Sequence, residues 1–189
     1  MFSKRLFALW CLVLASAIVP LPARAQSTEL AGTGAVEYRL VHKFHKFTGR
    51  SKAMVVRGAV DAGGLKAMAR AQVGTFDSDN TNRDEHMMET VEGTKYPWVT
   101  VRVAAMGYKL PTSPSTAKLV VQGAVELHGV TVNHPIELGV ETQDGVHFRV
   151  HFEFVESLTA HKIERPSLLF MPVDDTITIV GSAEITAKR

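Results

Sequence analysis

Histidines are the residues of this chain best suited to bind a metal ion, because neutral imidazole is a common ligand of transition metals. The 189 residues contain eight of them. His86, His128 and His161 lie outside the centres of the predicted strands, but no ligand-spacing motif joins them. His147 and His151 share one face of a predicted strand, yet an intervening residue of that face separates the two rings too far for chelation. We therefore predict no metal site and no cofactor, and keep a His-based metal binder or metal-assisted enzyme as an alternative.

The densest charged cluster is Arg83–His86, which holds an acid, a base and a cation together. A general base also needs a pocket and an orienting partner. The sequence indicates neither, so we favour a solvated helix start whose charges pair locally. Asp174 and Asp175 are typical of a turn before a strand. The sequence also lacks the short motifs of hydrolases, zinc proteases and nucleotide-binding folds, and we predict no catalytic residue and no enzyme.

The first 25 residues have the pattern of a secretory signal peptide. Lys4 and Arg5 give a positive start, and Leu6–Val19 is an apolar stretch too short to span a bilayer comfortably. An Ala-Arg-Ala run then fits a cleavage site before Gln26. We predict a periplasmic or secreted protein without a stable membrane anchor; the alternative is an uncleaved anchor.

The predicted mature domain, residues 26–189, contains no cysteine, because Cys11 is the only one in the chain. Loss of Lys4, Arg5 and Arg24 leaves its Lys and Arg residues one short of its 19 Asp and Glu residues. A net charge near zero gives no reason to expect nucleic acid or an anionic membrane as a partner. The composition, 46% hydrophobic and 21% charged, is that of one globular domain.

Alternation of apolar and polar residues dominates the mature part and predicts β-strands. Asp144-Gly145 is the strongest hairpin signal. A short helix is predicted at Arg83–Glu92, capped by Thr81 or Asn82, and a long loop at Ser157–Asp174. The eight predicted strands are Val36–Phe44, Met54–Val60, Leu65–Val73, Val99–Ala105, Leu119–Leu127, Val130–Val140, Val146–Phe154 and Ile177–Ile185. The pattern fits a closed barrel or a two-sheet sandwich.

One face of these strands carries no charged residue at the strand centres and mixes very small side chains with large ones. Small inward residues leave room for an apolar ligand, but they can also fit the taper of a filled barrel. His134 falls on this face and is interpreted as a hydrogen-bonded core histidine. The small residues expected there are Ala67, Ala69, Ala71, Ala105, Gly123, Gly181 and Ala183, with Gly139 if the register shifts past Pro135.

Several runs of the sequence resemble the YceI-like family. Thr75–Met87, with its R-D-x-H-M ending, and the later Lys95–Pro97 resemble one family motif, and Val121–Thr131 resembles its strand-turn-strand segment. In order and spacing the resemblance spans Val36–Glu184. The chain departs from the family where Arg165 is not followed by the usual Phe-Gly pair, and where the residues after Thr131 are neutral.

This resemblance implies an all-β, eight-stranded antiparallel, lipocalin-like barrel with an elongated apolar pore. It implies a polyisoprenoid or isoprenoid quinone as ligand, and no established catalytic residues. We therefore predict a lipid-binding carrier; a filled barrel that acts as a protein-interaction module is the other alternative, and the sequence leaves the oligomeric state open, a homodimer included. The predicted ligand-binding lining is Phe44, Met54, Val56, Ala69, Ala71, Phe148, Val150, Phe152 and Phe154, with Phe170 at one mouth.

Overall fold

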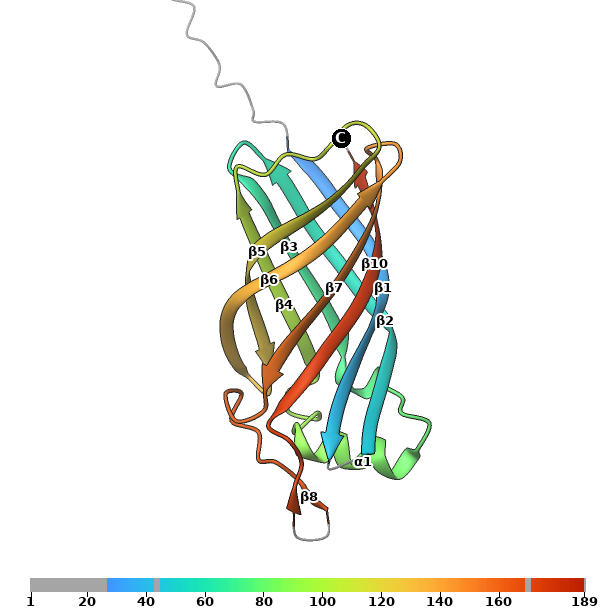
Figure 1. Ribbon diagram of the computed structural model, residues 1–189, viewed down its shortest axis with the longest axis vertical. Coiled ribbons are helices and arrows are strands. Elements are labelled where there is room, and N and C mark those ends of the chain that lie inside the picture. Colours follow the sequence, from blue (N-terminus) through green and yellow to red (C-terminus); the bar gives the residue numbers. More distant parts are fainter. Residues whose placement is uncertain (1–26, 43–44, 169–170, 189) are drawn as a thin grey trace, which may run out of the picture.

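The computed structural model describes residues 27–42, 45–168 and 171–188. Eight antiparallel strands close into a barrel in the order β1-β10-β7-β6-β5-β4-β3-β2 (Figure 1). Closure removes free sheet edges, and the eight-stranded barrel prediction is confirmed. The barrel strands are β1 (Thr28–His42), β2 (His45–Asp61), β3 (Gly64–Gln72), β4 (Trp98–Met106), β5 (Ser115–Leu127), β6 (Val130–Thr142), β7 (His147–Ser157) and β10 (Thr176–Lys188).

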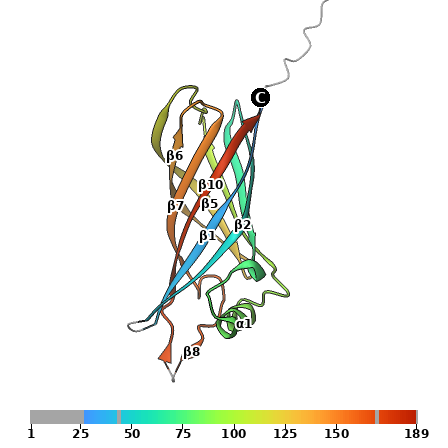
Figure 2. The same ribbon diagram turned by 90° about the vertical axis from the view of Figure 1, so that its right-hand side faces the viewer.

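The remaining elements gather at the lower end of the barrel (Figures 1 and 2). They are the 3-10 turn η1 (Val73–Thr75), the helix α1 (Thr81–Thr90) and a small hairpin of β8 (Ser167–Leu168) and β9 (Met171–Pro172). The hairpin interrupts the predicted long loop. Within the described ranges, no helix is long and apolar enough to cross a membrane.

Helix α1 begins two residues earlier than predicted, and Asn80 is its N-cap rather than Thr81 or Asn82. The Asn80 side chain accepts a hydrogen bond from the backbone N–H of Arg83 at 3.0 Å. This bond satisfies one of the free amides of the first turn. Asp84 lies in the same turn, where the helix dipole favours negative charge.

Strand β2 changes its inward face at a bulge that the alternation pattern did not reveal. Ser51 and Met54 are both buried, and Lys52 and Ala53 between them are both exposed. The Ser51 hydroxyl accepts a hydrogen bond from the Ala53 N–H at 3.2 Å. One extra residue in a strand moves all the following side chains to the opposite face of the sheet. The bulge therefore directs Phe47, below it, and Met54, above it, into the same interior.

The upper end of the barrel is filled by apolar side chains from six strands. Phe148 is 3% exposed and lies at the centre of this packing. Tyr108 and Leu110, from the β4–β5 connection, pack against it. The buried residues of this cluster are Leu30, Val60, Leu65, Val140, Phe148 and Ala187.

The lower part of the barrel contains a seam between β6 and β7. The two strands pair only from Leu138–Phe152 to Thr142–Phe148, so β6 residues 130–137 have no backbone pairing to β7. Figure 1 shows the two strands separating below this point. Pro135 lies in the unpaired stretch, which is where a strand tolerates a residue without an N–H. The segment after β7, with Leu158 and Ile163 buried, lies beside the start of β6.

Candidate functional site: an apolar cavity in the barrel

A cavity of about 650 Å³ runs through the barrel interior. This volume lies within the range of pockets that hold small molecules, roughly 300–1,000 Å³. Its wall is formed by the inward residues of all eight barrel strands and by the inner side of α1. The wall is predominantly aliphatic and aromatic, so the interior is suited to an apolar guest.

The structure places eight of the ten predicted lining residues at the cavity wall. They are Met54, Val56, Ala69, Ala71, Phe148, Val150, Phe152 and Phe154. Phe44 and Phe170 lie outside the described residues. That these side chains contact a ligand stays a prediction.

The inward glycines provide packing space for large neighbours. A Cβ atom on Gly123 would lie 2.4 Å from the Ile136 side chain, and one on Gly181 would lie 2.3 Å from the Phe152 ring. Gly139 faces outward, where its missing side chain leaves room for the His151 ring. The sequence placed Gly139 in the interior only if the strand register shifted past Pro135. No such shift occurs, because β5 and β6 stay in register through Pro135, so that placement is wrong.

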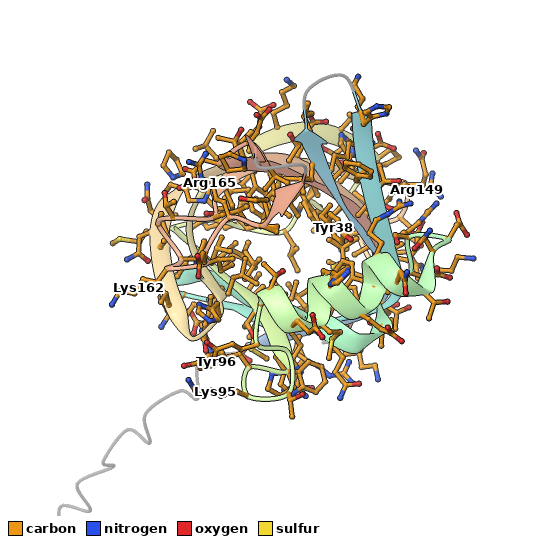
Figure 3. All side chains as sticks on the ribbon, turned by 90° about the horizontal axis from the view of Figure 1, so that it is seen from below. Tyr38, Lys95, Tyr96, Arg149, Lys162 and Arg165 are labelled. Atoms are coloured by element: carbon orange, nitrogen blue, oxygen red, sulfur yellow. The ribbon has the colours of Figure 1, made fainter. Side chains whose placement is uncertain are left out.

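Sequence reasoning missed several lining residues near the lower mouth. Tyr38 packs against Phe76 with ring centroids 5.8 Å apart, and Phe47 lies under the Arg83 guanidinium at 5.1 Å. Burial, followed by the nearby Asp84 carboxylate, raises the pKa of Tyr38. Figure 3 looks into this end of the barrel and shows Tyr38 directed toward the interior.

A buried polar cluster lies on the same wall, at the seam between β6 and β7. Glu156 is 3% exposed and lines the cavity. One carboxylate oxygen is 2.5 Å from Nε2 of His134, and the other is 3.0 Å from Nε2 of His161. His161 is fully buried. The three side chains connect β6, β7 and the following loop where backbone pairing is missing.

The hydrogen bonds of this cluster favour the protonated form of the His161 ring. Nδ1 of His161 faces the carbonyl of Val130 at 3.0 Å, and Nδ1 of His134 faces the carbonyl of Pro135 at 3.2 Å. With Glu156 at Nε2, both ring nitrogens of His161 face an oxygen acceptor, and imidazole donates from both nitrogens only as the cation. Burial alone would lower the pKa of His161, but the hydrogen bonds to Glu156 and Val130 outweigh burial and raise it.

A family model described as a YceI-like domain matches residues 26–185, which is most of the chain. The chain belongs to the YceI-like family. No curated protein sequence matches it.

Solved structures of other proteins share the YceI-like fold at low sequence identity. A polyisoprenoid binding domain from Saccharophagus degradans, implicated in plant cell wall breakdown, has a TM-score of 0.68 at 15% identity, covering 85% of this chain and 98% of that one. BcnA of Burkholderia cenocepacia has a TM-score of 0.65 at 15% identity, covering 80% and 95%. The YCEI protein of Campylobacter jejuni has a TM-score of 0.58 at 13% identity, covering 96% and 99%.

The acid–base run of this YceI-like chain is engaged in local contacts. Asp84 accepts a hydrogen bond from the Ser78 hydroxyl at 2.6 Å, and Arg83 donates to the Ser78 carbonyl at 3.3 Å. The exposed His86 side chain lies 3.3 Å from Glu89. These contacts agree with the local pairing expected from the sequence.

The three histidines considered for a metal do not converge. The His86 ring pairs on α1, whereas the His161 ring binds Glu156. The His128 ring donates from Nδ1 to the His161 backbone carbonyl at 3.1 Å. In the described part of the chain, no group of three His, Cys, Asp or Glu residues is arranged to hold a metal.

Proposed function

We propose that this YceI-like protein is a periplasmic or secreted, non-enzymatic carrier that holds an apolar, lipid-like molecule, a polyisoprenoid or isoprenoid quinone, inside its barrel. The observation that carries the proposal is the apolar cavity of about 650 Å³. Burying each methylene of a bound chain contributes about 0.8 kcal/mol. Several buried methylenes therefore suffice for binding without specific polar chemistry.

The two ends of the cavity favour one orientation of the bound chain. Packed apolar residues around Phe148 fill the upper end. Polar residues line the lower end, where Asn80, Asn82 and Arg83 of the α1 region border the cavity with Glu156. An amphiphile would therefore bury its tail upward and keep its polar end near α1, where polar groups meet partners.

The similarity to a polyisoprenoid binding domain supports the choice of ligand class. That protein shares the fold of this chain. A linear isoprenoid also suits a long, narrow barrel interior whose wall offers methyl and aromatic contacts along its length.

The proposal is tested by titrating delipidated protein with a polyprenyl alcohol. Ala69 lines the cavity and is only half-buried, so Ala69→Phe adds a ring where the ligand would lie. Val120→Phe places the same ring on the outer face of β5, where Val120 is 62% exposed. We expect at least tenfold weaker binding for Ala69→Phe, corresponding to about 1.4 kcal/mol, and unchanged binding for Val120→Phe. Equal binding by both variants would contradict a ligand inside the barrel.

A further inference from the structure

The outward face of three neighbouring strands, β2, β3 and β4, concentrates positive charge that the net charge of the chain conceals. The three strands contain seven Lys and Arg residues and one acidic residue, Asp61, at the end of β2. All seven basic side chains are exposed. They are Lys46, Arg50, Lys52, Arg57, Lys66, Arg70 and Arg102.

The sheet register brings these cations together with apolar side chains. Arg57 lies opposite Met68, which lies opposite Arg102 on the next strand. In the row below, Arg70 lies opposite Val55, which is 36% exposed. The face is therefore amphipathic, with cations and apolar groups interleaved across adjacent strands.

Few carboxylates neutralise this face. Arg102 pairs with Glu126 at 2.7 Å, but among the described residues no ion pair involves Arg57, Lys66 or Arg70. The Arg70 guanidinium instead lies 4.4 Å from the ring centre of Trp98. Trp98 is 37% exposed, so an amphipathic ring borders the cations.

Other outward surfaces of the barrel have a different charge arrangement. Three of their cations pair with carboxylates on the same or a neighbouring strand. The ion pairs are Arg39–Glu37 at 2.7 Å, Lys118–Glu137 at 2.8 Å and Arg149–Glu184 at 2.8 Å. The excess of positive charge is thus a property of the β2–β4 face.

The β2–β4 face is also hollowed. A shallow depression of about 680 Å³ lies among Arg57, Lys66 and Arg102. Its border includes Ala104 and Ala124, whose small side chains leave space between the longer cations. The depression offers room for phosphate groups that the three cations would contact.

We propose that the β2–β4 face docks the protein on an anionic lipid bilayer. Each Lys or Arg near an anionic lipid surface contributes favourably to binding, and Trp and other apolar side chains insert at the headgroup level. Interleaved apolar groups distinguish this face from a surface that binds a polyanion through charge alone. The choice of a membrane rests on the proposed function, because the cargo of the carrier is a membrane lipid.

The test is sedimentation of the protein with vesicles of pure phosphatidylcholine and of phosphatidylcholine with phosphatidylglycerol. All barrel strands lie between Thr28 and Lys188, so a chain that starts at Gln26 contains the whole closed sheet and omits the apolar stretch Leu6–Val19. We expect binding to the anionic vesicles only, weakening as salt rises. The triple variant Arg57→Gln, Lys66→Gln, Arg70→Gln should bind on the order of a hundredfold more weakly, at roughly fivefold for each charge removed.

The matched control is the triple variant Arg39→Gln, Lys118→Gln, Arg149→Gln, which changes the net charge equally on other faces and should retain binding. Equal loss in both variants, or no binding of the parent protein to anionic vesicles, would overturn the proposal. Binding to polyphosphate as strong as binding to vesicles would also overturn it, in favour of a polyanion partner. The assay needs no cargo, so loss of polyprenyl binding with intact vesicle docking would contradict the carrier function alone.

Discussion

The two ends of the barrel are held together by different physical interactions. At the upper end, apolar side chains around Phe148 pack together, and their contribution depends on area removed from water. At the lower end, β6 and β7 separate, and Glu156 joins them through His134 and His161. Packing of the first kind is insensitive to pH, whereas the second depends on protonation. We therefore expect the upper end to stay rigid at every pH and the closure of the lower end to change with protonation.

The largest expected effect is at the upper end. Phe148→Ala removes a buried ring and leaves a cavity, which should lower the free energy of unfolding by about 4 kcal/mol. Denaturant unfolding at pH 6 and pH 8 measures the loss, which should be equal at both. Val155→Ala, at a position 55% exposed, is the control and should change stability little. If the loss of unfolding free energy for Phe148→Ala depended on pH, the proposed difference between the two ends would be wrong.

Removal of the Glu156 charge should be the next largest effect. Glu156→Gln leaves two imidazoles without their carboxylate, and loss of one partner of a buried ion pair costs about 3 kcal/mol. Amide hydrogen exchange should increase in β6 residues 130–137 and in residues 158–163, with the upper end unchanged. Glu153→Gln, three residues earlier and exposed, is the matched control. Uniformly faster exchange throughout the barrel would refute a local role for the cluster.

The pH dependence of stability should come from the lower end. Because the folded state raises the pKa of His161 above its ordinary 6.5, the stabilisation from its charged form is fully present below that value. It is lost as the pH rises through the raised folded-state pKa. The groups that contact the ring are the Glu156 carboxylate and the backbone of Val130 and Leu127, and His134 shares the same carboxylate. Unfolding measured from pH 5 to pH 9 should show this decline.

The variant His161→Gln isolates that effect. Its stability should be lower than that of the parent at pH 6, and the difference should shrink toward pH 9 because the parent ring is then neutral. A difference that stays constant from pH 6 to pH 9 would mean that His161 stabilises the seam by packing rather than by charge.

The smallest expected effect is at the start of α1. Asn80→Ala removes the side-chain acceptor for the Arg83 N–H and should lower stability by about 1 kcal/mol. Thr81→Ala, next to the cap, should have a smaller effect. If the two variants were equivalent in thermal unfolding, Asn80 would not be the cap.

Period-two alternation predicted the strands well, because each strand has one side facing the interior. The inward positions of Phe152 and Phe154 followed from it. Continuing the alternation for two more residues would also have placed Glu156 in the interior, but the strand was predicted to end before it. His134 was expected to be a hydrogen-bonded core residue, and its bond to Glu156 agrees with that interpretation.

Other features depend on contacts that alternation does not encode. The bulge at Lys52 and Ala53 shifts the parity of β2 without a turn signal, so Phe47 was not placed in the interior. His161 lies within the predicted long loop Ser157–Asp174, and its position depends on how that loop folds back to Val130. The basic β2–β4 face was also missed, because net charge says nothing about which strands become neighbours.

The most direct test of the carrier function is native mass spectrometry of the protein purified from the compartment in which it accumulates. We expect a discrete added mass equal to one lipid, which organic extraction removes and which is then identified as an isoprenoid. Protein of bare mass that also fails to take up an added polyprenyl alcohol would contradict the central claim.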